Sequence, residues 1–299
     1  MAIKQVRALI NGTWYTLTPT GANTYTATVT APGATSYNQT NGYYNVSVEA
    51  TNEAGTVATT DGSVMNSLRL VVKEKIAPII TILTPTSGAY VTNNKQPVSF
   101  TITDESNGSG INLNTLVVKV EGTAVAANTL TRTAITNGYS VVYTPATALS
   151  DGSHTVTIAV SDNDGNAATQ KSTSFKIDTV PPTLNVTAPV NDLITAIVSL
   201  VVRGTTNDST SSPVTISVAL NGSNQGNASV DSSGAFTKTI TLVEGGNTII
   251  VTATDSSGKT SSVTRTVTLD TSVPKVESAV IAPNPVDAGT TMVITVVVK

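Results

Sequence analysis

Hydrophobic and polar residues alternate along this chain in short stretches with a period of two, and no stretch follows the period of a helix. Because successive side chains of a strand point to opposite faces, this alternation is typical of strands with one face in a core. Turn-forming pairs such as Asn-Gly, Asp-Gly and Ser-Gly interrupt the alternation about every ten residues. The pattern therefore predicts an all-β protein built from many short strands.

Comparison of the chain with itself reveals a repeat. Three segments superimpose: NGYYNVSVEATNEAG at 41–55, DGSHTVTIAVSDNDG at 151–165 and GGNTIIVTATDSSG at 245–258. In each copy the strand is followed by an Asn or Asp and, three residues later, by a Gly, which suits a tight loop with positive φ. We expect these alternating apolar positions to face the core: Val46, Val48 and Ala50; Val156, Ile158 and Val160; Ile249, Val251 and Ala253.

Proline-bearing junctions near residues 76, 179 and 271 separate the copies, and they should be stiff because proline restricts itself and its predecessor. A second landmark, a strand that ends in Asn-Gly or Glu-Gly, lies upstream in each copy. Only 12 residues lead to Gly12 in the first copy, against 45 from Pro78 to Gly122 in the second. We therefore divide the chain into a unit that lacks its first strands (1–75), two complete units (76–178 and 179–270) and the first two strands of a further unit (271–299).

Units of about 100 residues with about seven short alternating strands and no helix are typical of immunoglobulin-like sandwiches. The strings DGSHTVTIAVSDNDGNAATQKSTSFKIDTVPPT and SGINLNTLVVKVEG resemble tandem bacterial immunoglobulin-like (Big-type) repeats, found on cell-surface proteins and on virions of tailed phages. The resemblance covers essentially the whole chain. It implies tandem immunoglobulin-like β-sandwiches in a rod, with incomplete units at both ends. It says little about function, because this sandwich serves many roles.

The final segment, IAPNPVDAGTTMVITVVVK at 281–299, predicts a strand, a turn and a second strand. Met292, Ile294, Val296 and Val298 would fill one face, yet two strands cannot bury a face by themselves. Residues 272–299 resemble the strands that residues 3–75 lack, so one hypothesis is head-to-tail strand complementation between chains, with these four side chains mediating self-assembly. Two alternatives stay open: the chain is a fragment of a longer repeat protein, or the first unit is a naturally short sandwich and the tail pairs locally.

Composition narrows the classes of partner. Only 12% of the residues are charged, the formal net charge is -3 and no run of Lys or Arg occurs, so neither nucleic acid nor an anionic membrane is favoured. The chain has no cysteine, which excludes disulfides and thiolate sites. We also find no apolar stretch long enough for a membrane helix and no apolar core of a signal peptide, so we expect a soluble chain without a visible export signal.

Signatures of catalysis are missing, since no Gly-x-Ser-x-Gly, His-Glu-x-x-His or P-loop motif occurs. His154 is the only histidine, and the aligned positions hold Tyr44 and Asn247. A position at the start of a strand that accepts Tyr, His and Asn is typical of a corner residue that hydrogen-bonds nearby backbone. We therefore predict a protein that is not an enzyme, in which His154 has a structural role.

Acidic loops are the candidate metal sites. Asp104 lies in TDESNGSG, and Asp162 and Asp164 lie in SDNDGN. Calcium prefers about six to eight oxygen ligands, and carboxylates gathered where two sandwiches meet could supply several of them. The alternative is a plain turn, because Asp, Asn and Gly supply the same loop geometry without a metal. We expect no cofactor, with calcium (Ca2+) as the single candidate.

Aromatic residues gather near the start of the chain, where six of the twelve lie within the first 44 residues. Trp14, Tyr15 and Tyr43 are candidates for a surface that binds a glycan or a protein, since Trp and Tyr offer amphipathic contact area. Tyr44 is in phase with Val46, so part of this cluster should belong to a core. The same aromatics would line the groove if the first unit receives a hairpin from another chain.

These observations favour a structural or adhesive protein. The context we prefer is a phage virion component, such as a tail, a fibre or a capsid appendage, assembled in the host cytoplasm, with virion proteins or other copies of itself as partners. The first alternative is an internal segment of a bacterial adhesin at the cell surface. The second is a glycan-binding accessory module, which depends on the aromatic cluster alone.

Overall fold

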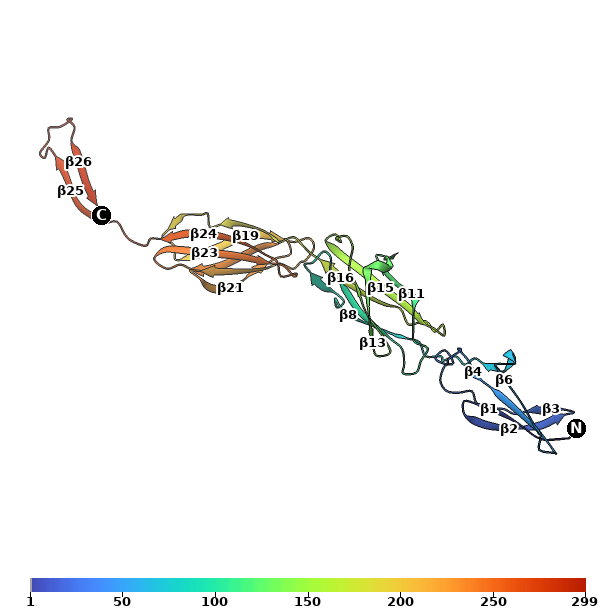
Figure 1. Cartoon of the computed structure of the whole chain (residues 1–299). Coiled ribbons are helices and arrows are strands. Elements are labelled where there is room, and N and C mark those ends of the chain that lie inside the picture. The colour runs from blue at the N-terminus through green and yellow to red at the C-terminus, as the bar shows by residue number, and fades with distance from the viewer. Residues whose placement is uncertain (1) are drawn as a thin grey trace. The chain divides into compact units, whose positions relative to one another are not determined.

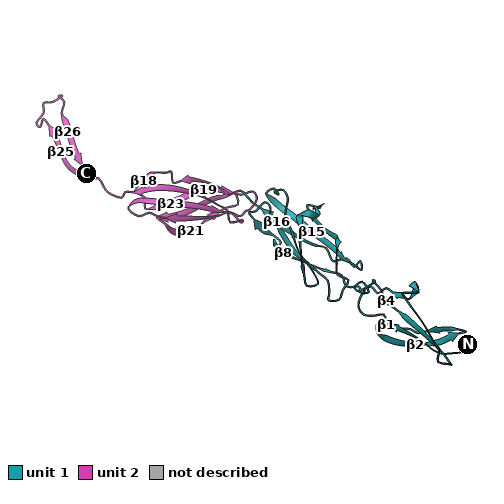
Figure 2. Ribbon diagram, viewed as in Figure 1, with its two compact units in different colours: residues 1–179 teal, residues 180–299 magenta. Residues whose placement is uncertain are grey.

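The computed structural model describes residues 2–299, and its regular secondary structure is almost entirely strand, with two short 3-10 turns, which confirms the all-β prediction. Its contacts define two compact units, residues 1–179 and residues 180–299 (Figure 2). The finer boundaries that we predict within these units stay predictions. Among residues 2–299, none of the helical segments has the length and apolar character needed to cross a membrane.

The first 75 residues form one five-stranded sheet in the order β3-β2-β1-β5-β6 and a separate strand pair, β4-β7 (Figure 1). The elements are β1 (Ile3–Ile10), β2 (Thr13–Gly21), β3 (Thr24–Thr26), β4 (Tyr44–Asn45), β5 (Ser47–Asn52), β6 (Val57–Asp61), the 3-10 turn η1 (Asn66–Leu68) and β7 (Arg69–Leu70). In the antiparallel register Ala8 lies opposite Tyr15 on one side and opposite Val48 on the other. Cross-strand partners point to the same side of a sheet, so these three side chains share one face.

This face, which we call the open face, is apolar but is not covered by a second sheet. Seven of its apolar side chains are half-buried: Val6, Ala8, Ile10, Tyr15, Leu17, Val48 and Ala50. Thr13 and Ala58, at the margins of the same face, are exposed. Among residues 2–75, Tyr44 is the only large apolar side chain that is buried. Residues 2–75 therefore have the sheet of one half of a sandwich.

The next segment of the first unit is a complete sandwich. One sheet has the order β13-β14-β10-β8 and the other β12-β11-β15-β16-β9. The elements are β8 (Ile79–Thr84), β9 (Ala89–Val91), β10 (Val98–Thr103), β11 (Ile111–Val120), β12 (Thr123–Ala124), the 3-10 turn η2 (Ala127–Thr129), β13 (Leu130–Ile135), β14 (Gly138–Tyr143), β15 (Gly152–Asp162) and β16 (Lys171–Ile177). Phe100 of the first sheet and Phe175 of the second are fully buried in one continuous core.

The second unit repeats this architecture with its own core around Phe236. Its strands follow the order β17-β19-β22-β21-β20-β23-β24-β18, in which β21 pairs with β20 and with β22 and so joins the two halves. The elements are β17 (Thr183–Ala188), β18 (Leu193–Thr195), β19 (Ser199–Asn207), β20 (Thr215–Leu220), β21 (Ser223–Val230), β22 (Ala235–Thr241), β23 (Gly245–Thr254) and β24 (Thr260–Leu269).

The predicted core positions behave differently in the three copies. Those of β15 and β23 are confirmed: all six are buried, from Val156, Ile158 and Val160 to Ile249, Val251 and Ala253. In the first copy the aligned Val46, Val48 and Ala50 are only half-buried. The residue pattern is the same, so the difference comes from the sheet that is missing opposite the open face.

The chain ends in a hairpin formed by β25 (Val276–Ala282) and β26 (Val293–Val298), which pair with each other and with no other strand of residues 2–299. Ile281 lies opposite Ile294, and Ala279 lies opposite Val296. Every residue from 271 to 299 is exposed, including the four side chains that we predict for self-assembly, Met292, Ile294, Val296 and Val298. The hairpin therefore has no core of its own.

Candidate functional site: a carboxylate cluster

Polar contacts in the first unit join the segment after β7 to two loops of the following sandwich. Glu74 accepts hydrogen bonds through Oε1 from the backbone N–H and the hydroxyl of Ser109, at 3.3 and 3.0 Å. The backbone N–H of Glu74 donates to Asp164 Oδ2 at 3.1 Å, and Asn166 Nδ2 donates to the carbonyl of Glu74 at 3.2 Å. Glu74 is therefore held between the loop after β10 and the loop after β15.

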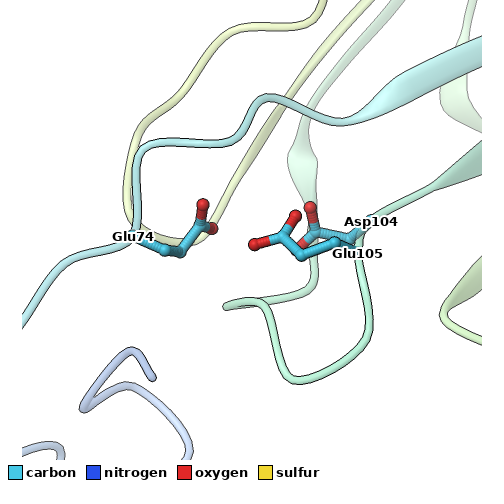
Figure 3. A group of neighbouring side chains, drawn as sticks. All are labelled: Glu74, Asp104 and Glu105. Atoms are coloured by element: carbon cyan, nitrogen blue, oxygen red, sulfur yellow. The ribbon is translucent and has the colours of Figure 1, made fainter. Parts of the chain in front are cut away.

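Three carboxyl groups converge at this position: those of Glu74, Asp104 and Glu105 (Figure 3). Each offers one oxygen, and these oxygens all lie within 4.8 Å of one another. Asp104 is only 8% exposed, and its Oδ2 accepts the backbone N–H of Gly110 at 2.7 Å. Its other oxygen, Oδ1, and Glu105 Oε2 are buried without a hydrogen-bond partner among residues 2–299. Two acceptor atoms in the cluster are thus left unsatisfied, which costs free energy unless a donor or a cation supplies the contact.

Burial and neighbouring charge both act on Glu105. Burial raises the pKa of this carboxyl from an ordinary value of 4.5 to about 7, and the hydrogen bond and negative charge of Asp104 and the charge of Glu74 act in the same direction. Protonation of Glu105 would supply the missing donor. A divalent cation would do the same for more oxygens at once, because Ca2+ is a hard cation that prefers carboxylate and carbonyl oxygens.

The surroundings leave room for further ligands. A hollow of about 460 Å³ adjoins the cluster, and its lining includes Asn107, Asn137 and Asn163. Gly108 closes the loop against the carboxyl groups: a Cβ atom at this residue would lie 2.6 Å from Asp104 Oδ2. A larger residue at this position would force the carboxyl groups of Asp104 and Glu105 to shift. The donor set and the unsatisfied oxygens therefore fit a hard cation that completes its shell with water.

The three aspartates that the sequence analysis proposes for calcium do not come together as one ligand set. Asp162 is buried and holds its own turn, because Oδ1 accepts the N–H groups of Gly165 and Asn166, at 2.6 and 2.8 Å. Asp164 accepts hydrogen bonds from Thr35 and Glu74. Asp104 alone belongs to the cluster, where its neighbours are Glu74 and Glu105. Calcium binding itself stays a prediction.

Sequence reasoning passed over Glu74, although a signal for it exists. Glu74 lies in the proline-bearing junction KEKIAP, four residues before Pro78, and the next junction, KIDTVPP, carries Asp178 three residues before Pro181. An acidic residue shortly before the proline is thus common to both junctions. Alignment of the junctions, in addition to the strands, would have selected Glu74.

The candidate binding aromatics do not share one surface. Trp14 is 42% exposed and stacks under the guanidinium of Arg7, 4.1 Å from the ring centre, and Arg7 pairs with Glu49 at 2.8 Å. Tyr15 is the next residue along β2 and lies on the open face. Tyr43 is half-buried with the guanidinium of Arg69 5.0 Å from its ring. Trp14 and Tyr15 therefore point to opposite sides of the sheet, and their binding role stays a prediction.

The corner role predicted for His154 is confirmed by its contacts. The His154 ring is buried and Nε2 lies 2.7 Å from the carbonyl of Ser150. At the aligned positions, the Tyr44 hydroxyl donates to the carbonyl of Ala34 at 3.1 Å, and Asn247 Nδ2 donates to the carbonyl of Val243 at 2.7 Å. All three side chains thus fasten a preceding loop to the start of a strand.

Comparison with known proteins agrees with this architecture. The model of a bacterial Ig-like domain matches residues 85–179, and the model of glucodextranase domain B matches residues 182–271. Together with the two closed sandwiches, these matches define the class: a tandem immunoglobulin-like repeat protein, as the resemblance of the sequence implies.

Solved structures give weaker likenesses. The fibronectin(III)-like modules of Clostridium thermocellum CbhA are 17% identical with a TM-score of 0.40, over 64% of this chain and 94% of that chain. Sidekick-1 immunoglobulin domains 1-5 are 14% identical with a TM-score of 0.40, over 92% of this chain and 56% of that chain. No curated protein matches the chain. The assignment of class therefore rests on the sheets and on the two family models.

Proposed function

We propose that the chain is a non-enzymatic structural or adhesive protein whose sandwiches act as spacers. The observation that carries this proposal is the direct succession of two closed sandwiches: β16 ends at Ile177 and β17 begins at Thr183, so few residues separate one core from the next. Such serial domains place their end loops at set distances along a chain, and proline-bearing links limit bending.

Within this class we favour a virion component, in a tail, a fibre or a capsid appendage. The resemblance to Big-type repeats of phage virions supports this context, and a chain without cysteine folds without disulfides in the reducing cytoplasm where virions assemble. Antibodies raised against the chain should label purified virions. Labelling of the bacterial surface in the absence of virions would instead favour the adhesin alternative and overturn the virion context.

The glycan-binding alternative depends on Trp14. If the chain were an accessory module, a glycan array should show binding that Trp14→Ala removes and that a change on the opposite side of the same strand, Tyr15→Ala, does not. An array without binding, or binding unaffected by Trp14→Ala, would leave the structural proposal as it stands and reject this alternative.

A second role is favoured by the unsatisfied oxygens of Asp104 and Glu105. We infer that a divalent cation, with calcium as the best match to an all-oxygen donor set, binds between these residues and Glu74. Glu74 follows β7, whereas Asp104 and Glu105 follow β10. A bound cation would therefore cross-link residues 2–75 to the next sandwich and stiffen the chain at this point.

Titration calorimetry of the full chain with CaCl2 tests this role. We expect binding that is lost in Asp104→Asn/Glu105→Gln and weakened in Glu74→Gln, while the exposed turn variant Asp231→Asn binds like the parent. The melting temperature of the parent should fall when a chelator is added. The cation role would be contradicted if Asp104→Asn/Glu105→Gln still showed the heat of calcium binding, or if the parent chain bound no calcium at millimolar concentration. Neither result would contradict the structural role.

A further inference from the structure

The open face and the terminal hairpin are two apolar surfaces of the same chain that both lack a cover. In the complete sandwiches, the positions aligned with Val48 of the open face, Ile158 and Val251, are fully buried beneath an opposing sheet. Val48 and its neighbours Ala8 and Tyr15 remain half-buried because residues 2–75 provide no such sheet.

The opposing sheet begins with the same element in both complete sandwiches. In the first, β8 pairs antiparallel with β10; in the second, β17 pairs antiparallel with β19. In each pair a proline follows the first strand directly, at Pro85 and Pro189. The terminal hairpin has this same form: β25 pairs antiparallel with β26, and Pro283 follows β25. Its connecting segment, 283–292, is as long as the segment 189–198 of the second sandwich, which there includes the short strand β18.

The hairpin thus has the form of the strand pair that opens each complete sandwich. We propose that the β25–β26 hairpin of one copy packs on the open face of residues 3–75 in a second copy and completes a sandwich there. Because the donor and the acceptor surfaces are different, each copy would retain one free donor and one free acceptor, and the contact would propagate from head to tail.

The chemistry of the two surfaces matches. The strands of the hairpin carry one charged side chain, Glu277 near the start of β25 at an irregularity of the pairing, and the loop carries Asp287. The half-buried apolar side chains of the open face carry no charge, so the contact would bury no charge if Glu277 stays at its edge. Of the two hairpin faces, the one with Ala279, Ile281, Ile294 and Val296 is wholly apolar, whereas the other includes Ser278 and Thr295. The geometry therefore points to the Ile281–Ile294 face as the docking face.

A hollow shows where a strand would enter. At the end of the open face near Ile10, an apolar hollow of about 320 Å³ is lined by Val29, Leu68, Leu70 and Val71 in addition to Ile10. Val29 and Val71 are exposed at its rim. A strand added beside this hollow would cover these side chains, which the segment between β3 and β4 leaves in contact with solvent.

The first test is to measure the molar mass of the chain by light scattering while the protein concentration is varied about a hundredfold. We expect the mass of the full chain to rise above that of a monomer, and Ile294→Asp to hold it at the monomer. Val293→Asp, on the other hairpin face, should impair assembly much less. Both variants should keep the unfolding transitions of the two sandwiches, because no hairpin residue belongs to either core.

Disulfide trapping tests which surfaces meet in the contact. Because the chain has no native cysteine, any disulfide that forms must join the introduced cysteines. When a Val48→Cys chain is mixed with an Ile294→Cys chain, oxidation should link them into a dimer far more readily than a mixture of Val48→Cys with Val293→Cys. A chain that stays monomeric at every concentration would overturn the proposal. A mass that Ile294→Asp leaves unchanged would also overturn it. The same holds if a chain that carries both Val48→Cys and Ile294→Cys forms the disulfide only within one monomer.

Discussion

The hydroxyl of Thr35 donates a hydrogen bond to Asp164 Oδ2 at 2.5 Å, and so connects two residues that are 129 positions apart in the sequence. Thr35 is only 1% exposed. The same carboxyl oxygen accepts the backbone N–H of Glu74. The Asp164 carboxyl group therefore ties residues 2–75 to the following sandwich with two hydrogen bonds, one of them from a nearly inaccessible hydroxyl, and the Asp164 carbonyl accepts a third from Lys73 Nζ at 3.1 Å.

Replacing Asp164 should weaken this connection. In Asp164→Ala the backbone N–H of Glu74 loses its charged acceptor, whereas the Thr35 hydroxyl keeps the carbonyl of Val72 at 3.3 Å as an acceptor. A buried donor left unsatisfied costs about 1–3 kcal/mol. We expect residues 2–75 to unfold earlier in a urea titration, while the sandwich of the second unit unfolds as before. The matched variant Asp287→Ala removes an exposed carboxyl and should leave both transitions in place. If the two variants had the same urea transitions, the hydrogen bonds of the Asp164 carboxyl would not be what stabilises residues 2–75.

Gly204 is predicted to be irreplaceable within β19. A Cβ atom there would lie 2.2 Å from the carbonyl oxygen of Asn185 and 2.5 Å from the ring of Phe236. Gly204→Ala should therefore destabilise the second unit by about 1–3 kcal/mol or more through overpacking. Gly246→Ala is the control, because no atom lies within 4 Å of its added methyl group. Calorimetric unfolding compares the two, and an unchanged Gly204→Ala transition would contradict the packing described here.

The missing opposing sheet predicts a contrast between two valines at aligned positions. Val251 is 0% exposed, so Val251→Ala should cost about 2–3 kcal/mol for the lost methyl groups and the cavity. Val48 is half-buried on the open face, and Val48→Ala should cost about 1 kcal/mol or less in dilute solution. Denaturant titrations of both variants measure the difference. A large loss from Val48→Ala in the monomer would mean that the open face is already covered.

Glu105 should make the stability of the first unit depend on pH. Its pKa is about 7 in the folded chain and close to 4.5 when unfolded, so between these values the folded chain holds a proton that the unfolded chain has lost. Its contribution is complete below about pH 4.5 and is lost as the pH rises through about 7. The melting temperature of the parent should therefore fall over this window relative to Glu105→Gln.

Calcium should reverse this dependence, because cation binding requires deprotonated carboxylates and becomes stronger as the pH rises. With saturating calcium the parent should gain stability relative to Glu105→Gln above about pH 7. The exposed variant Glu277→Gln serves as a control that should follow the parent in both series. A parent and a Glu105→Gln variant with parallel pH profiles would show that the Glu105 carboxyl is not perturbed.

Several properties follow from the sequence because they depend on neighbours in the chain. Alternation along β15 and β23 predicts which side chains enter the core, since a strand turns every second residue to the same side. The repeated position of His154 and Asn247 predicts a corner residue, because the backbone groups that it fastens lie only a few residues away. Family models then matched the same two segments, residues 85–179 and 182–271.

Other properties were decided only by the tertiary structure. Val48 and Val251 have the same sequence pattern, yet one is half-buried and the other is fully buried, because burial depends on a second sheet that the strand itself does not encode. The carboxylate cluster also depends on the tertiary structure. Glu74 reaches Asp104 and Glu105 only because the segment after β7 packs against the loop after β10, and such convergence of distant loops leaves no periodic trace in the chain.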